Sequence, residues 1–124
     1  MGRYYSGDIN GKFWFGVQAS NDADHFGQRG YRPERLNYYF EDADLPKVKK
    51  ELRRCRTELG KYKKAIDDFF KKNNGYNDEM MARELHITTK KLASLLEIYA
   101  RLELGNKILT CLKNHGSCEF EAEL

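Results

Sequence analysis

The apolar residues in the middle of the chain follow a heptad spacing. Between Leu45 and Phe69 they recur alternately three and four residues apart, which places them on one seam of a helix. The seam consists of Leu45, Val48, Leu52, Cys55, Leu59, Tyr62, Ile66 and Phe69. The pattern therefore predicts a long amphipathic helix with one apolar face.

The ends of this helix are indicated by residues that favour helix termini. Asp44 can cap the first turn, Pro46 is tolerated within it, and Gly75 suits the end. We therefore predict a long helix over residues 45–74. Gly60 is unfavourable in a helix interior and marks a place where the helix would kink or split, although the seam continues in phase across it and favours one helix.

Both ends of the chain carry patterns typical of strands. Residues 3–9 and 12–19 are rich in aromatic and β-prone residues, and the Asn10-Gly11 pair between them is a strong hairpin signal. Residues 118–124 alternate strictly between apolar and acidic, which predicts a strand with one buried face. We expect this strand to join the N-terminal hairpin in one antiparallel sheet.

Two further features concern the N-terminal segment, residues 1–44. Residues 20–37 are predicted to be a loop, and residues 38–40 a short edge strand. Adjacent aromatic residues such as Tyr4 and Tyr5 point to opposite faces of a strand, so we expect both faces of the sheet to be covered.

Residues 77–114 are predicted to form a unit of three short helices. The first ends at Leu85, the second runs from Lys90 to about Leu102, and the third follows Gly105. Together with the sheet and the basic helix, this unit predicts an α+β fold in a single domain, residues 1–124, since the length suits one hydrophobic core.

The first part of this unit resembles the helix-turn-helix superfamily. The apolar positions that would lock two crossing helices are Met81, Ala82, Leu85, Ile87, Leu92 and Leu95. His86 stands where the turn usually has glycine, so it must adopt a left-handed conformation. The resemblance implies that Thr88, Thr89 and Lys90 face a nucleic-acid groove. A helical pair that serves only as core explains the same apolar spacing.

Charge is concentrated on the predicted long helix. Residues 45–72 hold eleven Lys and Arg against four Asp and Glu, whereas the segments on either side are slightly acidic. The residues that we expect to contact phosphates are Lys49, Lys50, Arg53, Arg54, Arg56, Lys61 and Lys64. A solvated helix face is the alternative interpretation of this charge.

The heptad also permits a homodimer through residues 45–70. Glu51 and Glu58 fall at position g while Arg56 and Lys63 fall at position e, which is an attractive arrangement in a parallel coiled coil. Packing of the seam against the sheet of the same chain is the alternative.

A second candidate surface is rich in aromatic and arginine residues, which dominate protein interfaces. It comprises Tyr31, Arg32, Arg35, Tyr38 and Tyr39. We interpret it as a site for a host protein, in particular one that itself handles nucleic acid. Stacking of nucleobases on these rings, and burial of the rings in the core, are the alternatives.

Catalytic and metal-binding chemistry is weakly indicated. Asp22, Asp24 and His25 form the one loop cluster suited to acid–base chemistry or a divalent ion, and polar capping explains it equally well. The three cysteines are few and widely spaced, which predicts reduced thiols. We expect no enzyme activity, no cofactor and no metal site.

The N-terminal run from Tyr4 to Ile9, followed by the run from Lys12 to Gln18, resembles small proteins encoded by phages and large DNA viruses. The resemblance implies a compact viral accessory protein, in a class that includes inhibitors of host defence systems. It transfers no functional residue.

These observations favour binding over catalysis. The primary hypothesis is a nucleic-acid-associated protein that uses the basic helix, and the alternatives are an inhibitor of a host protein and, third, a small metal-dependent enzyme. No run of about 20 apolar residues is present to span a bilayer, so we expect a cytoplasmic protein without membrane contact, in the host cytosol if it is viral.

Overall fold

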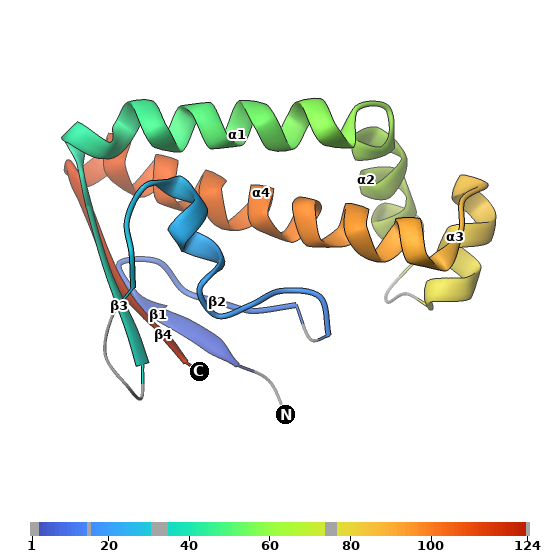
Figure 1. Ribbon diagram of the computed structural model, residues 1–124, viewed down its shortest axis with the longest axis horizontal. Coiled ribbons are helices and arrows are strands. Elements are labelled where there is room, and N and C mark those ends of the chain that lie inside the picture. The colour runs from blue at the N-terminus through green and yellow to red at the C-terminus, as the bar shows by residue number, and fades with distance from the viewer. Residues whose placement is uncertain (1–2, 15, 31–34, 74–76, 124) are drawn as a thin grey trace.

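The computed structural model describes residues 3–14, 16–30, 35–73 and 77–123 (Figure 1). These residues form an α+β fold, as predicted, in which strands from both ends of the chain share one sheet. The strands are β1 (Tyr4–Gly7), β2 (Gly11–Lys12), β3 (Arg35–Glu41) and β4 (Ser117–Glu123). The α-helices are α1 (Leu45–Leu59), α2 (Tyr62–Lys72), α3 (Asp78–Leu85) and α4 (Thr89–His115), and two short 3-10 helices are η1 (Asp22–Phe26) and η2 (Asp42–Asp44).

The sheet is antiparallel with the strand order β2-β1-β4-β3. The C-terminal strand β4 lies between β1 and β3, with Ala122 opposite Tyr5 on one side and Phe120 opposite Tyr38 on the other. Two predictions are thereby confirmed, namely that the C-terminal strand joins the hairpin and that residues 38–40 lie in an edge strand. That strand begins earlier than predicted, at Arg35.

One face of the sheet is buried and the other is open. The rings of Tyr38, Phe40 and Phe120 stack on the buried face, with the Tyr38 and Phe120 centroids 5.2 Å apart. Tyr4 and Tyr39, on the opposite face, are each 50% exposed. The expectation that both faces are covered is therefore wrong, because adjacent aromatic residues put one ring in the core and leave the other in water.

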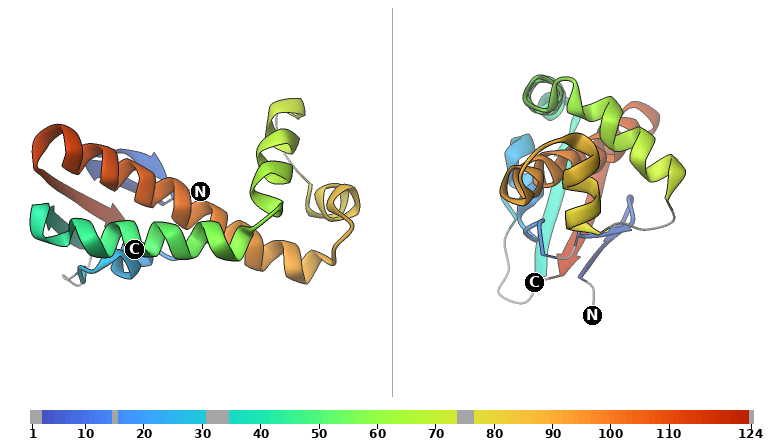
Figure 2. Two further views of the ribbon diagram at one scale, coloured as in Figure 1. Left: turned by 90° about the horizontal axis from the view of Figure 1, so that it is seen from above. Right: turned by 90° about the vertical axis from the view of Figure 1, so that its right-hand side faces the viewer.

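The heptad seam of α1 packs against α4, and the two helices run antiparallel, side by side (Figures 1 and 2). Val48, Leu52 and Leu59 are at most 1% exposed, and Ile108 of α4 is fully buried with them in one core. The C-terminal half of α4 then reaches the sheet, where β4 follows directly (Figure 1). The seam is therefore the core of this chain, so the predicted homodimer through residues 45–70 has no free seam to use.

The predicted long helix over residues 45–74 is divided at Gly60, which corrects the expectation of one helix. Gly60 has a φ of 51° and a ψ of −129°, a conformation that favours glycine, and its N–H donates to the carbonyl of Arg56 at 3.0 Å. The chain turns there, so that α2 leaves the axis of α1 (Figure 2).

The turn at Gly60 lets α2 face an aromatic cluster instead of continuing along α4. Trp14 packs edge-on against Phe70 of α2, with centroids 5.6 Å apart, and against Tyr99 of α4, with centroids 5.8 Å apart. The Tyr99 hydroxyl also donates to Asp67 of α2 at 2.5 Å. Packing and a hydrogen bond therefore fix the direction of the second half of the seam.

The unit predicted as three helices contains two, because α4 runs unbroken through Gly105. A Cβ atom at Gly105 would collide with the ring of Phe26 in η1 and would lie 2.7 Å from Leu52 Cδ2 of α1. Glycine is used here for the close approach of three elements, and the surrounding contacts offset its unfavourable helix propensity. The predicted break before residue 106 is therefore wrong.

The N-terminal hairpin forms as predicted but is shorter. Its second strand holds two residues, and Gly11, predicted in the turn, pairs with Tyr5 instead. The Asn10 side-chain oxygen accepts the Gly7 N–H at 3.3 Å and closes the loop. Residues 13–14 and 16–19 leave the sheet and carry Trp14 toward α2.

Substitution of Gly105 by Ala tests the close packing on α4. Gly→Ala normally stabilises a helix interior by about 1 kcal/mol. Here we expect a loss of about 1–3 kcal/mol in the free energy of unfolding, because the added methyl group overpacks the contact with Phe26. Urea unfolding followed by circular dichroism measures this change in the free energy of unfolding, with Ser94→Ala on the exposed side of α4 as the control. A gain in stability at Gly105 contradicts this account.

Candidate nucleic-acid interface

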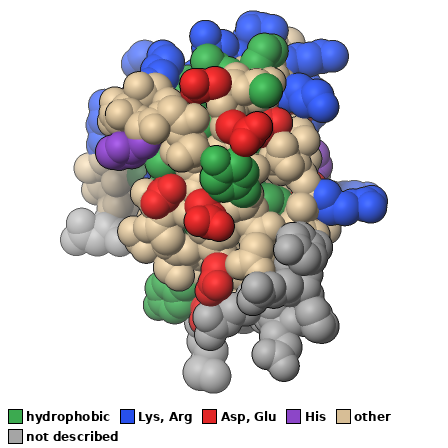
Figure 3. All heavy atoms as spheres, turned by 90° about the vertical axis from the view of Figure 1, so that its left-hand side faces the viewer, with side chains coloured by type: hydrophobic (Ala, Val, Ile, Leu, Met, Phe, Trp, Pro, Cys, Tyr) green, Lys and Arg blue, Asp and Glu red, His purple; other side chains and the backbone are tan. Residues whose placement is uncertain are grey.

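The exposed side of α1 carries two rows of cationic side chains, and Figure 3 shows Lys and Arg gathered at the top of the molecule, where α1 lies. The first, the outer row, consists of Lys49, Arg53 and Arg56, and the second, the inner row, consists of Lys47, Lys50 and Arg54. Residues three or four apart share a helix face, and the apolar seam occupies the face toward α4. All six cations therefore point away from the core.

Carboxylates of the same chain neutralise only part of this surface. Arg54 donates to Glu51 and to Glu58 at 2.6 Å, and the hydrogen bond with Glu51 raises the pKa of Arg54. Lys49 and Arg53 are exposed and form no ion pair among the described residues. Glu51 and Glu58, which a parallel coiled coil would pair with a second chain, are thus used within α1.

Glu51 stays ionised beside this surface. Burial raises its pKa, but the hydrogen bonds and the charge of Arg54 outweigh burial and hold the pKa of Glu51 below its usual range. The pair of Glu51 and Arg54 is therefore a fixed, nearly neutral unit, and the free positive charge of α1 lies on its neighbours.

A hollow of about 420 Å³ lies between the inner row and η1. Its lining includes Lys47, Lys50 and Arg54 from α1 and Asp24, His25 and Gly27 from η1 and its C-terminal end. Two predicted features, the basic helix and the loop cluster with His25, thus meet at one place. The hollow contains charges of both signs, so it is less basic than the outer row.

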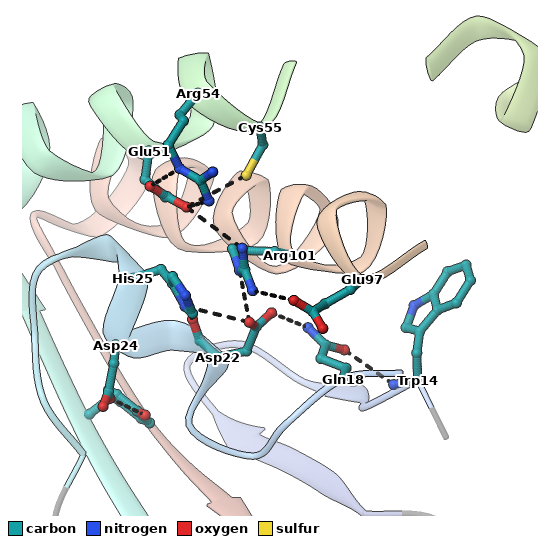
Figure 4. Close-up of polar contacts among 11 residues, drawn as sticks. Trp14, Gln18, Asp22, Asp24, His25, Glu51, Arg54, Cys55, Glu97 and Arg101 are labelled. Carbon is teal, nitrogen blue, oxygen red and sulfur yellow. Dashed lines mark hydrogen bonds and ion pairs between the residues drawn. The ribbon is translucent and has the colours of Figure 1, made fainter. Parts of the chain in front are cut away.

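Behind this hollow lies a buried ion pair that joins three parts of the fold (Figure 4). The Arg101 Nε of α4 donates to Asp22 of η1 at 2.8 Å, and the two side chains are 7% and 2% exposed. The other Asp22 oxygen accepts from Gln18 at 2.9 Å. Arg101 also donates to Glu97 at 3.2 Å and lies 4.0 Å from Glu51 of α1.

The loop cluster has structural partners for each of its members. His25 Nδ1 lies 2.9 Å from the carbonyl oxygen of Asp22. Asp24 accepts the Tyr38 hydroxyl at 2.5 Å and the Gly30 N–H at 3.0 Å. The two carboxylates point apart (Figure 4), and in the part of the chain that the structure describes no group of three His, Cys, Asp or Glu side chains is placed to hold a metal ion.

Helices α3 and α4 are joined by a short turn at His86, and apolar residues on both sides of the turn are buried. Met81 and Leu92 are fully buried, Ala82 is 4% exposed, and His86 adopts the predicted left-handed conformation with a φ of 59°. Thr88 caps α4 by accepting the Lys91 N–H at 3.1 Å. Of the residues expected at a groove, Thr89 and Lys90 are exposed, and the Thr88 hydroxyl is already engaged.

The structure brings the start of α4 next to the start of α2. Lys61 and Lys91 each lie 5.4 Å from the centroid of the Tyr62 ring, in cation–π geometry. Lys64, by contrast, pairs with Asp68 at 3.3 Å. Lys91 was missed as a site residue because nothing in the sequence relates it to a lysine thirty residues earlier.

The aromatic and arginine surface is only partly available. Tyr38 is 1% exposed and belongs to the core, which corrects its assignment to an interface, because its ring stacks inward and its hydroxyl binds Asp24. Burial also raises the pKa of Tyr38. Tyr39 is exposed, whereas Tyr31, Arg32 and the side chain of Arg35 lie outside the described residues.

No protein-family model, curated protein sequence or solved structure matches this chain. The resemblance to viral and phage proteins therefore stays a prediction. No helix among the described residues is both long and apolar enough to span a membrane.

Substitution of Arg101 by Leu tests the buried ion pair. We expect a loss of about 3–5 kcal/mol in the free energy of unfolding, because the Asp22 carboxylate is left buried without its cation. Chemical denaturation measures this loss. The control is Arg54→Leu, which removes an exposed ion pair and is expected to cost about 0–1 kcal/mol. The Asp22→Asn/Arg101→Leu double variant should be more stable than Arg101→Leu alone. Equal losses at Arg54 and Arg101 would rule out the special role of this pair.

Proposed function

We propose that this protein binds nucleic acid without catalysing a reaction, and that its principal contact is the exposed side of α1 with the phosphate backbone. The observation that carries the proposal is a group of three exposed cations within two helical turns that has no carboxylate partner among the described residues. The group consists of Lys49, Lys50 and Arg53.

Cations in this arrangement suit a polyanion. Lys and Arg that neutralise phosphates release condensed counterions, and this release drives association with little dependence on sequence. Since α1 spans fifteen residues, it is about 22 Å long and presents several cations to consecutive phosphates. Affinity at α1 is therefore expected to come from charge and to fall steeply with salt.

The acidic open face of the sheet restricts phosphate binding to the opposite, basic side of the molecule. Its exposed residues include Glu119 and Glu123 of β4 and Glu41 of β3, which repel phosphates. Figure 3 shows acidic side chains below the basic surface at the end of the molecule that carries the sheet. This polarity orients the protein on a nucleic acid with α1 toward the backbone.

The start of α4 is a second contact region in this proposal. Thr89 and Lys90 are exposed there, close in sequence to Lys91, which shares the Tyr62 ring with Lys61. This region lies at the end of the molecule opposite the sheet, and it is farther from the sheet than α1 is (Figure 1).

A second candidate function is inhibition of a host protein, and one observation favours it. Tyr39 lies half exposed in a hollow of about 570 Å³ on the acidic face, beside Glu41 and Glu119. Glu121 and Arg29 also line this hollow, so carboxylates outnumber cations around the tyrosine. Such a site suits a basic segment of a protein, and proteins that handle nucleic acid carry such segments.

The primary proposal is tested by a salt titration of binding to a labelled duplex and to a single strand. The variant Lys49→Gln/Lys50→Gln/Arg53→Gln removes three charges from α1. The plot of log affinity against log salt should become shallower by up to about 2.7 for the duplex and about 2.1 for the single strand, because each phosphate contact contributes about 0.9 or 0.7.

The matched control is Lys12→Gln/Lys71→Gln/Lys72→Gln, which removes three exposed charges elsewhere and should keep most of the slope. An absence of binding at low salt overturns the proposal. The same loss of slope in both triple variants would show that net charge alone, and not α1, is responsible.

A further inference from the structure

A third cavity, open to solvent, lies on the other side of α4, between its C-terminal half and the β1–β2 loop. It has a volume of about 470 Å³, in the range of ligand pockets. Ile9 and Cys111, which are 7% and 5% exposed, supply apolar lining. The polar lining includes the side chains of Asn106, Thr110, Asn114 and His115 from α4. The cavity thus combines an apolar part with groups that both donate and accept hydrogen bonds.

The β1–β2 loop that forms one wall is fixed in place. Lys107 Nζ donates to the Tyr5 hydroxyl at 2.9 Å and to the carbonyl oxygen of Asn10 at 3.0 Å. The Asp8 carboxylate accepts the Glu119 N–H at 2.9 Å. These bonds connect the loop to α4 and β4, so the cavity exists without a ligand and no ordering of the wall is needed on binding.

The cavity is connected to the outer row of α1. Arg56 Nη2 donates to Asn106 Oδ1 at 3.5 Å, so the last cation of the row touches the first of the polar lining residues on α4. Asn106, Thr110 and Asn114 are four residues apart and share one helix face, and α4 runs antiparallel to α1 (Figure 1). A row of hydrogen-bonding side chains therefore starts beside Arg56 and, because the two helices are antiparallel, runs back alongside the row of cations.

We infer that this cavity takes an unpaired nucleobase of a single-stranded nucleic acid whose phosphates lie on the outer row. The inference rests on the proposed function and narrows it from nucleic acid in general to single strands. The asparagine amides match the mixed donors and acceptors of a base edge, and Ile9 lies against the ring. A base in a duplex does not enter, because its edge is paired and its ring is stacked.

The outer row has the dimensions that this arrangement needs. Lys49 and Arg56 are seven residues apart, about 10 Å along the axis of α1. Phosphates bound by Lys49 and Arg53 lead the strand toward Arg56, and the next base turns into the cavity beside Asn106. Phosphate contacts then supply affinity, and the cavity supplies a preference for unpaired bases.

The experiment compares three fluorescent probes of equal length, namely a single-stranded oligonucleotide, the same strand with abasic sugars throughout, and the duplex. The wild-type protein should bind the intact strand about tenfold more tightly than the abasic strand at the same salt concentration. Asn114→Leu fills the cavity and should remove this tenfold preference while the salt dependence is unchanged. Ser94→Leu, on the exposed side of α4 away from the cavity, should keep the preference.

Thr110→Val provides a second, nearly isosteric variant should Asn114→Leu fail to fold, and it should weaken the preference in the same direction. Equal affinity for intact and abasic strands, with salt-dependent binding still lost in the α1 triple variant, overturns the base cavity and leaves the proposed function standing. No binding to any of the three probes overturns both.

Discussion

The ion pair between Arg101 and Asp22 is the interaction on which the arrangement of the surface depends. It fixes η1 to the middle of α4, and through Glu51 it extends to α1. Burying these charges is favourable only with full pairing, and Gln18 and Glu97 supply the remaining hydrogen bonds. Because Glu51 also holds Arg54, the same network decides which cations of α1 are neutralised and which remain available to a ligand.

The polarity of the molecule follows from two periodicities. On α1 every apolar position of the heptad is used in the core, so the cations between them must lie outside. On β4 the period is two, so Phe120 and Ala122 face the core while Glu119 and Glu123 face water. A basic side and an acidic side thus arise from the same patterns that build the core, and no separate feature of the fold is needed to create them.

Periodic patterns could be predicted from the sequence, whereas contacts between distant segments could not. Gly60 and Gly105 have the same intrinsic preference against helix, yet the helix ends at Gly60 and continues through Gly105. The difference is tertiary: Phe26 and Leu52 crowd Gly105, and at Gly60 a Cβ would have only the Thr57 carbonyl oxygen near it, at 3.8 Å. Neither neighbour of Gly105 is close to it in sequence. Strand alternation required Tyr38 and Tyr39 to point to opposite faces, but both were assigned to one surface, and only the packing shows that Tyr38 is the buried one.

In the candidate site too, the periodic features could be predicted from the sequence and the contact between distant segments could not. The cation rows of α1 were predictable because residues three and four apart share a helix face, but the Arg56–Asn106 contact joins positions fifty residues apart. That contact changes the interpretation of the basic helix. An isolated row of cations recognises any polyanion, whereas in the binding mode that we propose, the cavity with amide side chains beside the row would distinguish exposed bases from paired ones. The packing of α1 on α4 is what places the cations of α1 beside this cavity, and the proposed recognition depends on that packing.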